Sequence, residues 1–197
     1  MTFKLGLTGS VGMGKSTTAK LFSEEGCDIW DADAAVHRLY AKGGLAVEPM
    51  ACLFPAAIEE GAVSREKLKT ILESNPDALK EIECIVHPLV AQDRAEFLKH
   101  TISDICVFDI PLLFETGSDE MMDATVCVTV GPDVQKARVL ERGTMTEEQL
   151  NIILAKQMPD SEKRARSDFV ITTDTLEHAK AQVQDIVRQI RATFTHA

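Results

Sequence analysis

The sequence predicts an α/β fold in which a parallel five-stranded sheet is flanked by helices. Five short segments are mostly apolar and rich in β-branched or aromatic residues, as is typical of strands that are buried on both faces. Segments with helical periodicity separate several of them, which favours strand–helix–strand units. The five predicted strands are Phe3–Thr8, Cys27–Trp30, Ile105–Phe108, Ala124–Val130 and Phe169–Thr172.

A glycine-rich loop follows the first predicted strand, and a helix is predicted from Thr17 to Glu25. Residues 9–16 match the phosphate-binding pattern G-x-x-x-x-G-K-[ST] at every position. Such a loop folds its backbone around an anion, which the N–H groups and the helix N-terminus attract. Lys15 is expected to reach the β- and γ-phosphates, and the Ser16 hydroxyl to hold Mg²⁺. We therefore expect a P-loop NTPase-type fold with ATP contacts from Gly9, Gly12, Met13, Gly14, Lys15, Ser16 and Thr17.

Composition excludes several classes of protein. The 197 residues are 45% hydrophobic and 26% charged, as in an ordinary globular protein, and the formal charge of −10 argues against non-specific nucleic-acid binding. The five cysteines are scattered, without spacing typical of a metal site, which favours a reducing compartment. No leader and no run of about 18 apolar residues is present, so we expect a cytoplasmic protein without membrane contact.

The segment between the second and third predicted strands has helical patterns and no strand pattern. One helix is expected to begin at Asn75-Pro76 and to end near His87-Pro88. We therefore expect a nucleotide-binding core formed by residues 1–31 and 105–197 and a helical substrate-domain insertion at 32–104.

Two further helices are predicted in the second half of the core. Thr146 and Gln149 have capping-box spacing and begin a lid helix, within a lid of about 143–160. The last helix carries a regular apolar stripe. Its members are Leu176, Ala179, Val183, Ile186, Val187 and Ile190.

Carboxylates follow two of the predicted strands, at the sheet edge where ligands of open α/β folds collect. Asp31 and Asp33 follow the second strand, where one could cap a helix and the other act as a base; Asp33 is the preferred base. Asp109 ends the third strand and is expected to bind Mg²⁺ through water, a turn residue before Pro111 being the alternative.

Basic residues gather in two places after the fourth predicted strand. Arg138 and Arg142 stand four apart on one helix face, where they could neutralise a transferring phosphoryl group or form a solvated surface. The run from Lys163 to Arg166 is read as a solvated loop, with a phosphate contact as the alternative.

Taken together, these segments resemble the dephospho-coenzyme A kinase family over nearly the whole length. The loop alone indicates only a phosphate-loop protein, whereas the D-A-D, H-P and P-L-L-F-E elements are far more specific. The matching pieces are Leu7–Thr17, Asp31–Asp33, Gly61–Arg65 with Leu68, His87-Pro88, Asp109–Glu115, Gln135 with Arg138 and Arg142, Gln157, and Ser167–Ile171.

The resemblance implies ATP-dependent phosphorylation of the ribose 3′-hydroxyl of dephospho-CoA, giving CoA and ADP with Mg²⁺ as cofactor. It implies that Asp33 is the catalytic base and that Lys15, Arg138 and Arg142 act on the nucleotide phosphates. It also implies a substrate domain in the helical insertion and a monomer or small homo-oligomer. The acceptor contacts implied are Asp33, His87, Asp109 and Leu113.

The sequence departs from the family pattern in places. Ser10 and Met13 occupy variable positions of the loop, and Pro55 stands where the family usually has glycine. Thr173 stands in place of a common asparagine, so a side-chain contact from this position to adenine is in doubt.

Two other activities are alternatives for a P-loop protein. A nucleoside or nucleotide kinase of related architecture would differ in what its helical insertion accepts. A regulatory GTPase or ATPase switch is disfavoured, because no N-K-x-D segment and no D-x-x-G segment follows the loop.

Overall fold

The chain folds into two compact units. One, the sheet unit, contains residues 1–30 and 101–197, and the other, the helical unit, contains residues 31–100. The structure is a computed structural model that describes residues 2–143 and 145–194, so that Thr144, in the predicted lid, lies outside the described residues.

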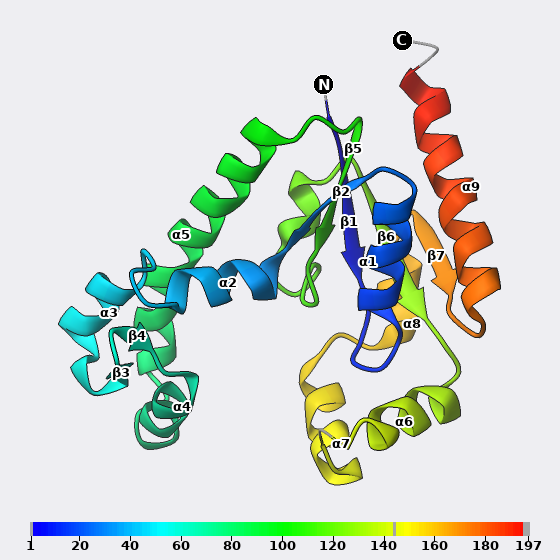
Figure 1. Ribbon diagram of the computed structural model, residues 1–197. Coiled ribbons are helices and arrows are strands. Elements are labelled where there is room, and N and C mark those ends of the chain that lie inside the picture. Colours follow the sequence, from blue (N-terminus) through cyan, green and yellow to red (C-terminus); the bar gives the residue numbers. More distant parts are fainter. Residues whose placement is uncertain (1, 144, 195–197) are drawn as a thin grey trace. The chain divides into compact units, whose positions relative to one another are not determined.

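The sheet unit is built around a parallel sheet with the strand order β2-β5-β1-β6-β7 (Figure 1). β1 lies in the middle, and its Leu7 is in register with Asp109 of β5 and with Val126 of β6. The five predicted strands are confirmed, with ends that differ by at most one residue. Their bounds are β1 Phe3–Thr8, β2 Asp28–Asp31, β5 Ile105–Asp109, β6 Ala124–Thr129 and β7 Phe169–Thr172.

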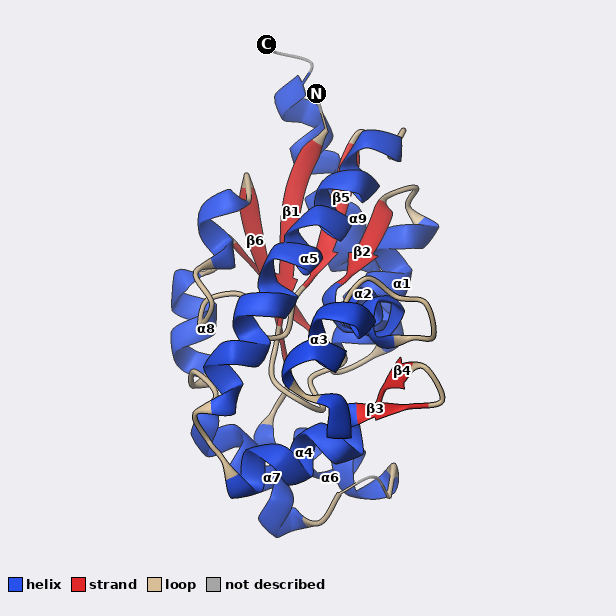
Figure 2. Ribbon diagram, turned by 90° about the vertical axis from the view of Figure 1, so that its left-hand side faces the viewer, coloured by secondary structure: helices blue, strands red, loops and turns tan. Residues whose placement is uncertain are grey.

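Helices cover both faces of this sheet. Figures 1 and 2 show α1 and α9 on one face and α8 on the other. The core between them contains the fully buried Leu5, Phe22, Val107 and Val183. The helices are α1 Lys15–Glu24, α6 Pro132–Glu141, α7 Glu147–Lys156, α8 Asp160–Arg166 and α9 Leu176–Phe194, with the short 3₁₀ helix η2 at Ser118–Met121.

Three of these helices, α1, α7 and α9, can be compared with the predictions at their N-terminal turns. α1 begins at Lys15, two residues before the predicted start, because the P-loop glycines pass directly into the helix. The capping box at Thr146 and Gln149 is confirmed. Leu176, the first member of the predicted stripe of α9, is 56% exposed because it lies in the first turn, while the other five members are buried.

The helical unit has its own apolar core, which includes Leu39, Met50, Ala57, Ile82 and Val86. Helices supply most of this core, as predicted. The elements are α2 Ala32–Tyr40, α3 Val47–Leu53, the 3₁₀ helix η1 Pro55–Ala57, β3 Ile58–Glu59, β4 Ala62–Val63, α4 Arg65–Ser74 and α5 Ala78–His100.

The expectation that residues 32–104 contain no strand was wrong. β3 and β4 pair antiparallel in a small hairpin (Figure 2). Its two-residue turn, Glu60 and Gly61, has φ angles of 51° and 82°, the positive values that a tight hairpin turn requires. Each strand has two residues, which is too few for an alternating pattern to be recognised.

The predicted bounds of α5 were also wrong at both ends. Asn75 ends α4, where its N–H donates to Ile71 O at 2.8 Å, and α5 begins at Ala78 after a turn. At the other end, Pro88 lies inside α5, and the helix continues to His100. An interior proline removes one backbone hydrogen bond, and burial of Ile82 and Val86 on the same helix offsets that loss.

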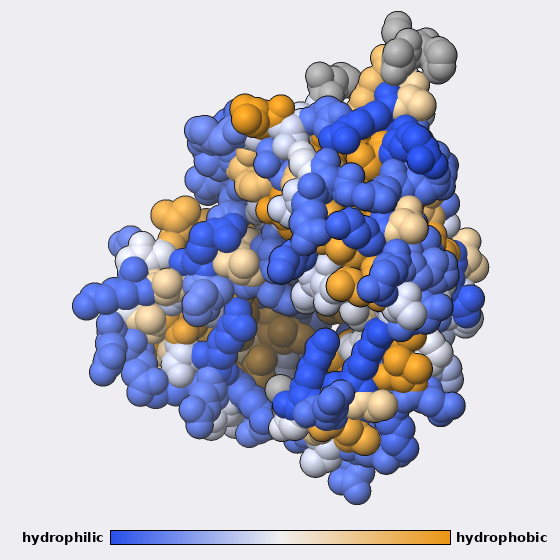
Figure 3. Space-filling model, turned by 45° about the vertical axis from the view of Figure 1, so that its right-hand side comes forward, coloured by the Kyte–Doolittle hydropathy of each residue, from blue (hydrophilic) through white to orange (hydrophobic). Residues whose placement is uncertain are grey.

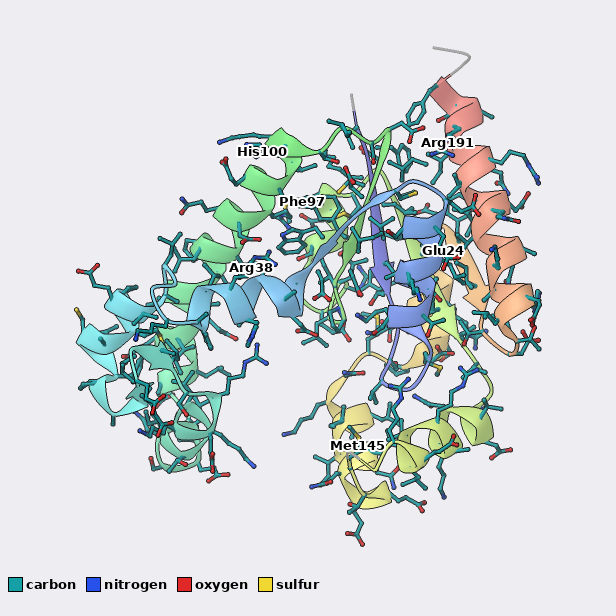
Figure 4. All side chains as sticks on the ribbon, in the orientation of Figure 1. Glu24, Arg38, Phe97, His100, Met145 and Arg191 are labelled. Carbon is teal, nitrogen blue, oxygen red and sulfur yellow. The ribbon has the colours of Figure 1, made fainter. Side chains whose placement is uncertain are left out.

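Charged side chains tie the elements within each unit (Figure 4). In the sheet unit, Arg191 of α9 binds Asp104 at 2.7 Å, and this hydrogen bond holds the pKa of Asp104 below its ordinary value. In the helical unit, Arg38 of α2 binds Asp93 of α5 at 2.6 Å.

Hydrophilic side chains cover most of the face shown in Figure 3, with apolar side chains in small areas between them. Of the helices in the described part of the chain, none combines the length and the apolar character that crossing a membrane requires.

Candidate active site

The P-loop joins β1 to α1 at the carboxyl end of the sheet. Gly12 and Gly14 have φ angles of 79° and 91°, a region that favours glycine. A Cβ atom on Gly12 would lie 2.5 Å from Cγ2 of Val139, so α6 leaves no room for a larger residue. Because Gly14 is the N-cap of α1, the first N–H groups of the helix face the loop without a capping side chain. This arrangement is suited to binding an anion.

Neighbouring elements hold the loop from outside. Gln135 of α6 donates from Nε2 to Val11 O at 2.8 Å, and Thr173, just after β7, donates from its hydroxyl to Met13 O at 2.7 Å. The side chain of Met13 is buried, with its sulfur 3.1 Å from the backbone nitrogen of Val130. Two carbonyl groups of the loop, those of Val11 and Met13, are therefore engaged by side-chain donors. The Met13 N–H donates within the loop to Ser10 O at 3.2 Å.

Lys15 and Asp109 meet beside the loop. Lys15 is the first residue of α1, and Asp109 ends β5, the neighbour of β1 in the sheet. The Lys15 ammonium forms an ion pair with the Asp109 carboxylate, which is 3% exposed. Ser16 and Thr17 are exposed at the start of α1. The structure thus brings together the predicted lysine, acid and hydroxyl.

A cavity of about 370 Å³ opens next to the P-loop, within the sheet unit. Its walls come from the start of α1, from α6 and its C-terminal end, and from the segment between β7 and α9. Arg138 and Arg142 both line it, and Arg142 is exposed. Arg138 donates to the hydroxyl of Thr173 at 3.0 Å and to its carbonyl at 2.5 Å.

The basic run 163–166 was predicted to be a solvated loop. It is helical instead, as part of α8. Residues 164–166 are exposed as expected, whereas the side chain of Lys163 is fully buried. Its ammonium lies 2.9 Å from Glu115 Oε1 and 3.0 Å from Pro111 O. The run has the polar composition of a surface segment, so the burial of Lys163 has no local signal.

Glu115 connects this buried lysine to the segment after α7. It accepts the backbone N–H of Met158 at 2.9 Å. Burial acts to raise the pKa of Glu115, but hydrogen bonds from Lys163 and from the Met158 N–H prevail and lower it. The carboxylate therefore ties the segment after α7 to Lys163 of α8.

The remaining candidate residues each lie within one of the two units. Asp31 caps α2 by accepting the Ala34 N–H at 2.9 Å, whereas Asp33 is exposed in the first turn of the same helix. His87 is exposed on α5. Leu113 is fully buried, and an added Cβ on Gly6 would meet its side chain at 2.9 Å. The substrate contacts assigned to Asp33, His87 and Leu113 stay predictions.

Two residues that hold the loop were not recognised as such from the sequence. In the sequence, Gln135 belongs to a motif that matches the family, and Thr173 departs from the family pattern. Neither observation predicts a contact with the loop. Position offered a signal for Thr173, because the residue after the last strand of a parallel sheet lies at the ligand-binding edge. The hydrogen bonds that it makes have no such signal.

In the described ranges, 2–143 and 145–194, no three His, Cys, Asp or Glu side chains are grouped so as to hold a metal ion. The Mg²⁺ contacts expected of Ser16 and Asp109 stay predictions.

A P-loop between the first strand and the first helix of a parallel sheet, with a lysine and a buried acid beside it, defines a P-loop NTPase-type fold. The chain belongs to the dephospho-CoA kinase family, because the family model described as "Dephospho-CoA kinase" matches residues 3–178.

Relatives named dephospho-CoA kinase agree with this assignment, and a solved structure has a similar fold. The chain is 66% identical to the dephospho-CoA kinase of Ruegeria pomeroyi, over 100% of both chains. It is 58% identical to that of Cereibacter sphaeroides, over 97% of both. A crystal structure from Thermus thermophilus has a TM-score of 0.85 at 30% identity and covers 95% of this chain and 97% of its own.

Proposed function

We propose that this chain transfers the γ-phosphoryl group of ATP to the 3′-hydroxyl of the ribose of dephospho-CoA, giving CoA and ADP. The family carries out the last step of coenzyme A biosynthesis and uses ATP. The observation that carries the proposal is the intact P-loop with Lys15 and Asp109 beside it, in a chain whose whole length matches curated dephospho-CoA kinases.

ATP is assigned to the sheet unit. Its phosphates lie on the P-loop, where backbone N–H groups, the N-terminus of α1 and the Lys15 ammonium supply positive charge. The cavity lined by Thr17, Arg138 and Thr173 is assigned to the adenine base, since it adjoins the loop. The assigned nucleotide contacts are Gly9, Gly12, Met13, Gly14, Lys15, Ser16 and Thr17.

Mg²⁺ fits the oxygen groups beside the loop. The ion is usually held by one or two protein oxygens, several waters and the phosphates of the nucleotide. The Ser16 hydroxyl is exposed where it would bind Mg²⁺ directly, and Asp109 would act through water. When bound, the ion neutralises charge on the β- and γ-phosphates. Lys15 then exchanges its contact with Asp109 for a phosphate oxygen.

The acceptor hydroxyl is assigned to Asp33. Because the carboxylate of Asp31 is engaged in capping α2, the exposed Asp33 is the group of this pair that is available as a base. In the reaction, the 3′-oxygen loses its proton to the Asp33 carboxylate and forms a bond to the γ-phosphorus, while the bond from this phosphorus to the bridging oxygen of ADP breaks. Further acceptor contacts are assigned to His87, Asp109 and Leu113.

The arginines of α6 have different tasks in this mechanism. Arg142 ends α6 at the rim of the cavity and is exposed, so its side chain is assigned to the transferring phosphoryl group. Arg138 is engaged by Thr173, and its charge acts on the nucleotide from the cavity wall.

Assembly and location complete the proposal. We assign a monomer or small homo-oligomer in the cytoplasm, without nucleic-acid or membrane partners. The formal charge of −10 supports the exclusion of nucleic acid. The free, exposed thiols of Cys52 and Cys84 are compatible with a reducing compartment.

The test is ADP release with ATP and Mg²⁺ in the presence of dephospho-CoA, AMP, adenosine or no acceptor, with the product identified by mass. The proposal expects release that depends on dephospho-CoA, with CoA as product. Release that depends on AMP or adenosine would reassign the acceptor, and release without any acceptor would indicate a nucleotide hydrolase.

A further inference from the structure

Thr173 has a fixed position between the P-loop and α6. It follows the last residue of β7 and is 7% exposed. Its backbone N–H donates to Thr129 O at 2.9 Å, which continues the pairing of β7 with β6 beyond the end of the strand. The side chain is therefore held on rigid backbone.

The hydroxyl of Thr173 links two groups that approach it from different elements. It donates to Met13 O at 2.7 Å and accepts from Nη1 of Arg138 at 3.0 Å. A hydroxyl has one proton, and the contact with Met13 O is shorter than the 3.4 Å to Thr129 O, so the proton lies toward the loop. The charged donor on the other side polarises the hydroxyl and strengthens the bond to Met13.

Fixing the carbonyl of Met13 also fixes the next N–H. Both groups belong to one planar trans peptide, in which the C=O and the N–H of Gly14 point in opposite directions. With the carbonyl held toward Thr173, the Gly14 N–H is held away from it. Gly14 itself lies against Thr173, since an added Cβ would be 3.0 Å from the hydroxyl oxygen.

We propose that Thr173 is a positioning residue for the nucleotide, whose hydroxyl sets the Met13–Gly14 peptide of the P-loop and the guanidinium of Arg138 in one hydrogen-bonded network. This inference rests on the proposed function in one respect, namely that ATP binds on the P-loop. It is independent of which acceptor receives the phosphoryl group.

The test compares three threonine variants. T173V keeps the branched shape and removes the hydroxyl, T173S keeps the hydroxyl, and T172V makes the same change one residue earlier. Thr172 is the matched control because its hydrogen bonds with Gln182 are made by its backbone N–H and C=O, which the substitution retains. Affinity for ATP with Mg²⁺ is measured by calorimetry without an acceptor, and KM and kcat are measured with dephospho-CoA.

T173V is expected to weaken ATP binding about tenfold, as the loss of one or two hydrogen bonds predicts. Its KM for dephospho-CoA is expected to stay within about twofold of the wild type. T173S and T172V are expected to keep ATP affinity within about twofold. If T173V binds ATP normally, or if T173S is as weak as T173V, the hydroxyl does not position the loop.

A double-mutant cycle tests the part played by Arg138. In an R138Q background, T173V is expected to weaken ATP binding less than it does in the wild type, because the two groups act through one network. Strictly additive effects would remove Arg138 from the proposal. Cooperative thermal melting is checked first, and T173C, with a weakly hydrogen-bonding thiol of similar size, replaces T173V if that variant does not melt cooperatively.

Failure of this inference is distinguishable from failure of the proposed function. Calorimetry without an acceptor reports on the nucleotide alone, so a wrong acceptor leaves the comparison of T173V with T173S intact. A wild-type chain that does not bind ATP would overturn both.

Discussion

The sheet unit and the helical unit are built by different means. In the sheet unit, polar side chains far apart in sequence are brought together inside the fold, as in the pairs Lys15 with Asp109 and Thr173 with Met13. In the helical unit, apolar residues form the core, and the candidate base Asp33 lies exposed on a helix. The difference teaches that the Lys15–Asp109 pair beside the P-loop is assembled by folding itself, whereas the proposed base Asp33 lies on the exposed surface of a helix.

The comparison predicts two classes of variant. Changes at the P-loop and the residues that contact it are expected to affect ATP binding or phosphoryl transfer with any acceptor. Changes at the exposed acceptor side are expected to spare ATP binding and to affect only the transfer step.

The largest effect is expected from Lys15. Lys15→Met removes the cation that neutralises the transferring phosphoryl group, and kcat is expected to fall about 10²–10³-fold. The same change at Lys20, which is exposed on α1, is the matched control and is expected to be close to the wild type. Steady-state kinetics with dephospho-CoA measures both.

Lys15→Met also leaves the buried carboxylate of Asp109 without that ion pair, so part of any loss could reflect unfolding. Thermal melting separates the two effects, because a folded variant with low kcat identifies a chemical role. A folded Lys15→Met variant with normal turnover would contradict the P-loop assignment.

Asp33 is expected to give the next largest effect on activity. Asp33→Asn removes the base, so kcat is expected to fall by ~10²-fold or more, within the usual range for general-base catalysis. Calorimetry without an acceptor is expected to show unchanged ATP affinity, because the assigned ATP contacts all lie in the sheet unit.

Asp31→Asn is the matched control for this prediction. Asparagine caps helices about as well as aspartate does, so α2 should be retained and activity should stay near the wild type. If Asp31→Asn were as inactive as Asp33→Asn, the two carboxylates would share the work. If Asp33→Asn were fully active, the base would be elsewhere.

Lys163 is expected to affect stability more than chemistry. Lys163→Met leaves the partly buried carboxylate of Glu115 uncompensated, which should cost about 3 kcal/mol of unfolding free energy. Chemical denaturation measures this, and adding Glu115→Gln is expected to recover part of the loss. If Lys163→Met alone were as stable as the wild type, the pair of Lys163 and Glu115 would not stabilise the C-terminal end of α7.

The same pair predicts a pH dependence. The folded-state pKa of Glu115 lies below its ordinary value of 4.5, so its contribution to stability is present above that pH and is lost as the pH falls through the folded-state pKa. The difference in unfolding free energy between the wild type and Lys163→Met should therefore shrink in acid. A difference that is constant with pH would exclude an ionic origin.

Local patterns explain which parts of the structure could be predicted from the sequence. The five strands of the sheet and the P-loop are contiguous segments whose apolar runs and glycine spacing are read directly. The hairpin of β3 and β4 was not predicted, because each strand is two residues long. The burial of Lys163 was not predicted, because it depends on Glu115, and the contacts of Thr173 were not predicted, because they depend on Met13. Only the fold brings these partners close together.

The smallest effect expected concerns the five cysteines, and it compares the two units directly. Burial raises the pKa of Cys27 to about 11 and of Cys106 and Cys127 to about 12, and all three lie in the sheet unit. Cys52 and Cys84 are exposed and lie in the helical unit. An alkylating reagent near pH 8 is expected to label these two quickly and the other three slowly, since only exposed thiolate reacts.

Peptide mass mapping over time measures this difference, and denatured protein, in which all five thiols react, is the control. Because none of the assigned catalytic residues is a cysteine, activity should persist while the first two thiols are labelled. Rapid labelling of Cys106 or Cys127 in the folded chain would require the sheet to open, because both lie in central strands. That result would contradict a phosphate site that is assembled by folding. Slow labelling that ATP slows further would support such a site, because a ligand that binds only the folded state suppresses opening.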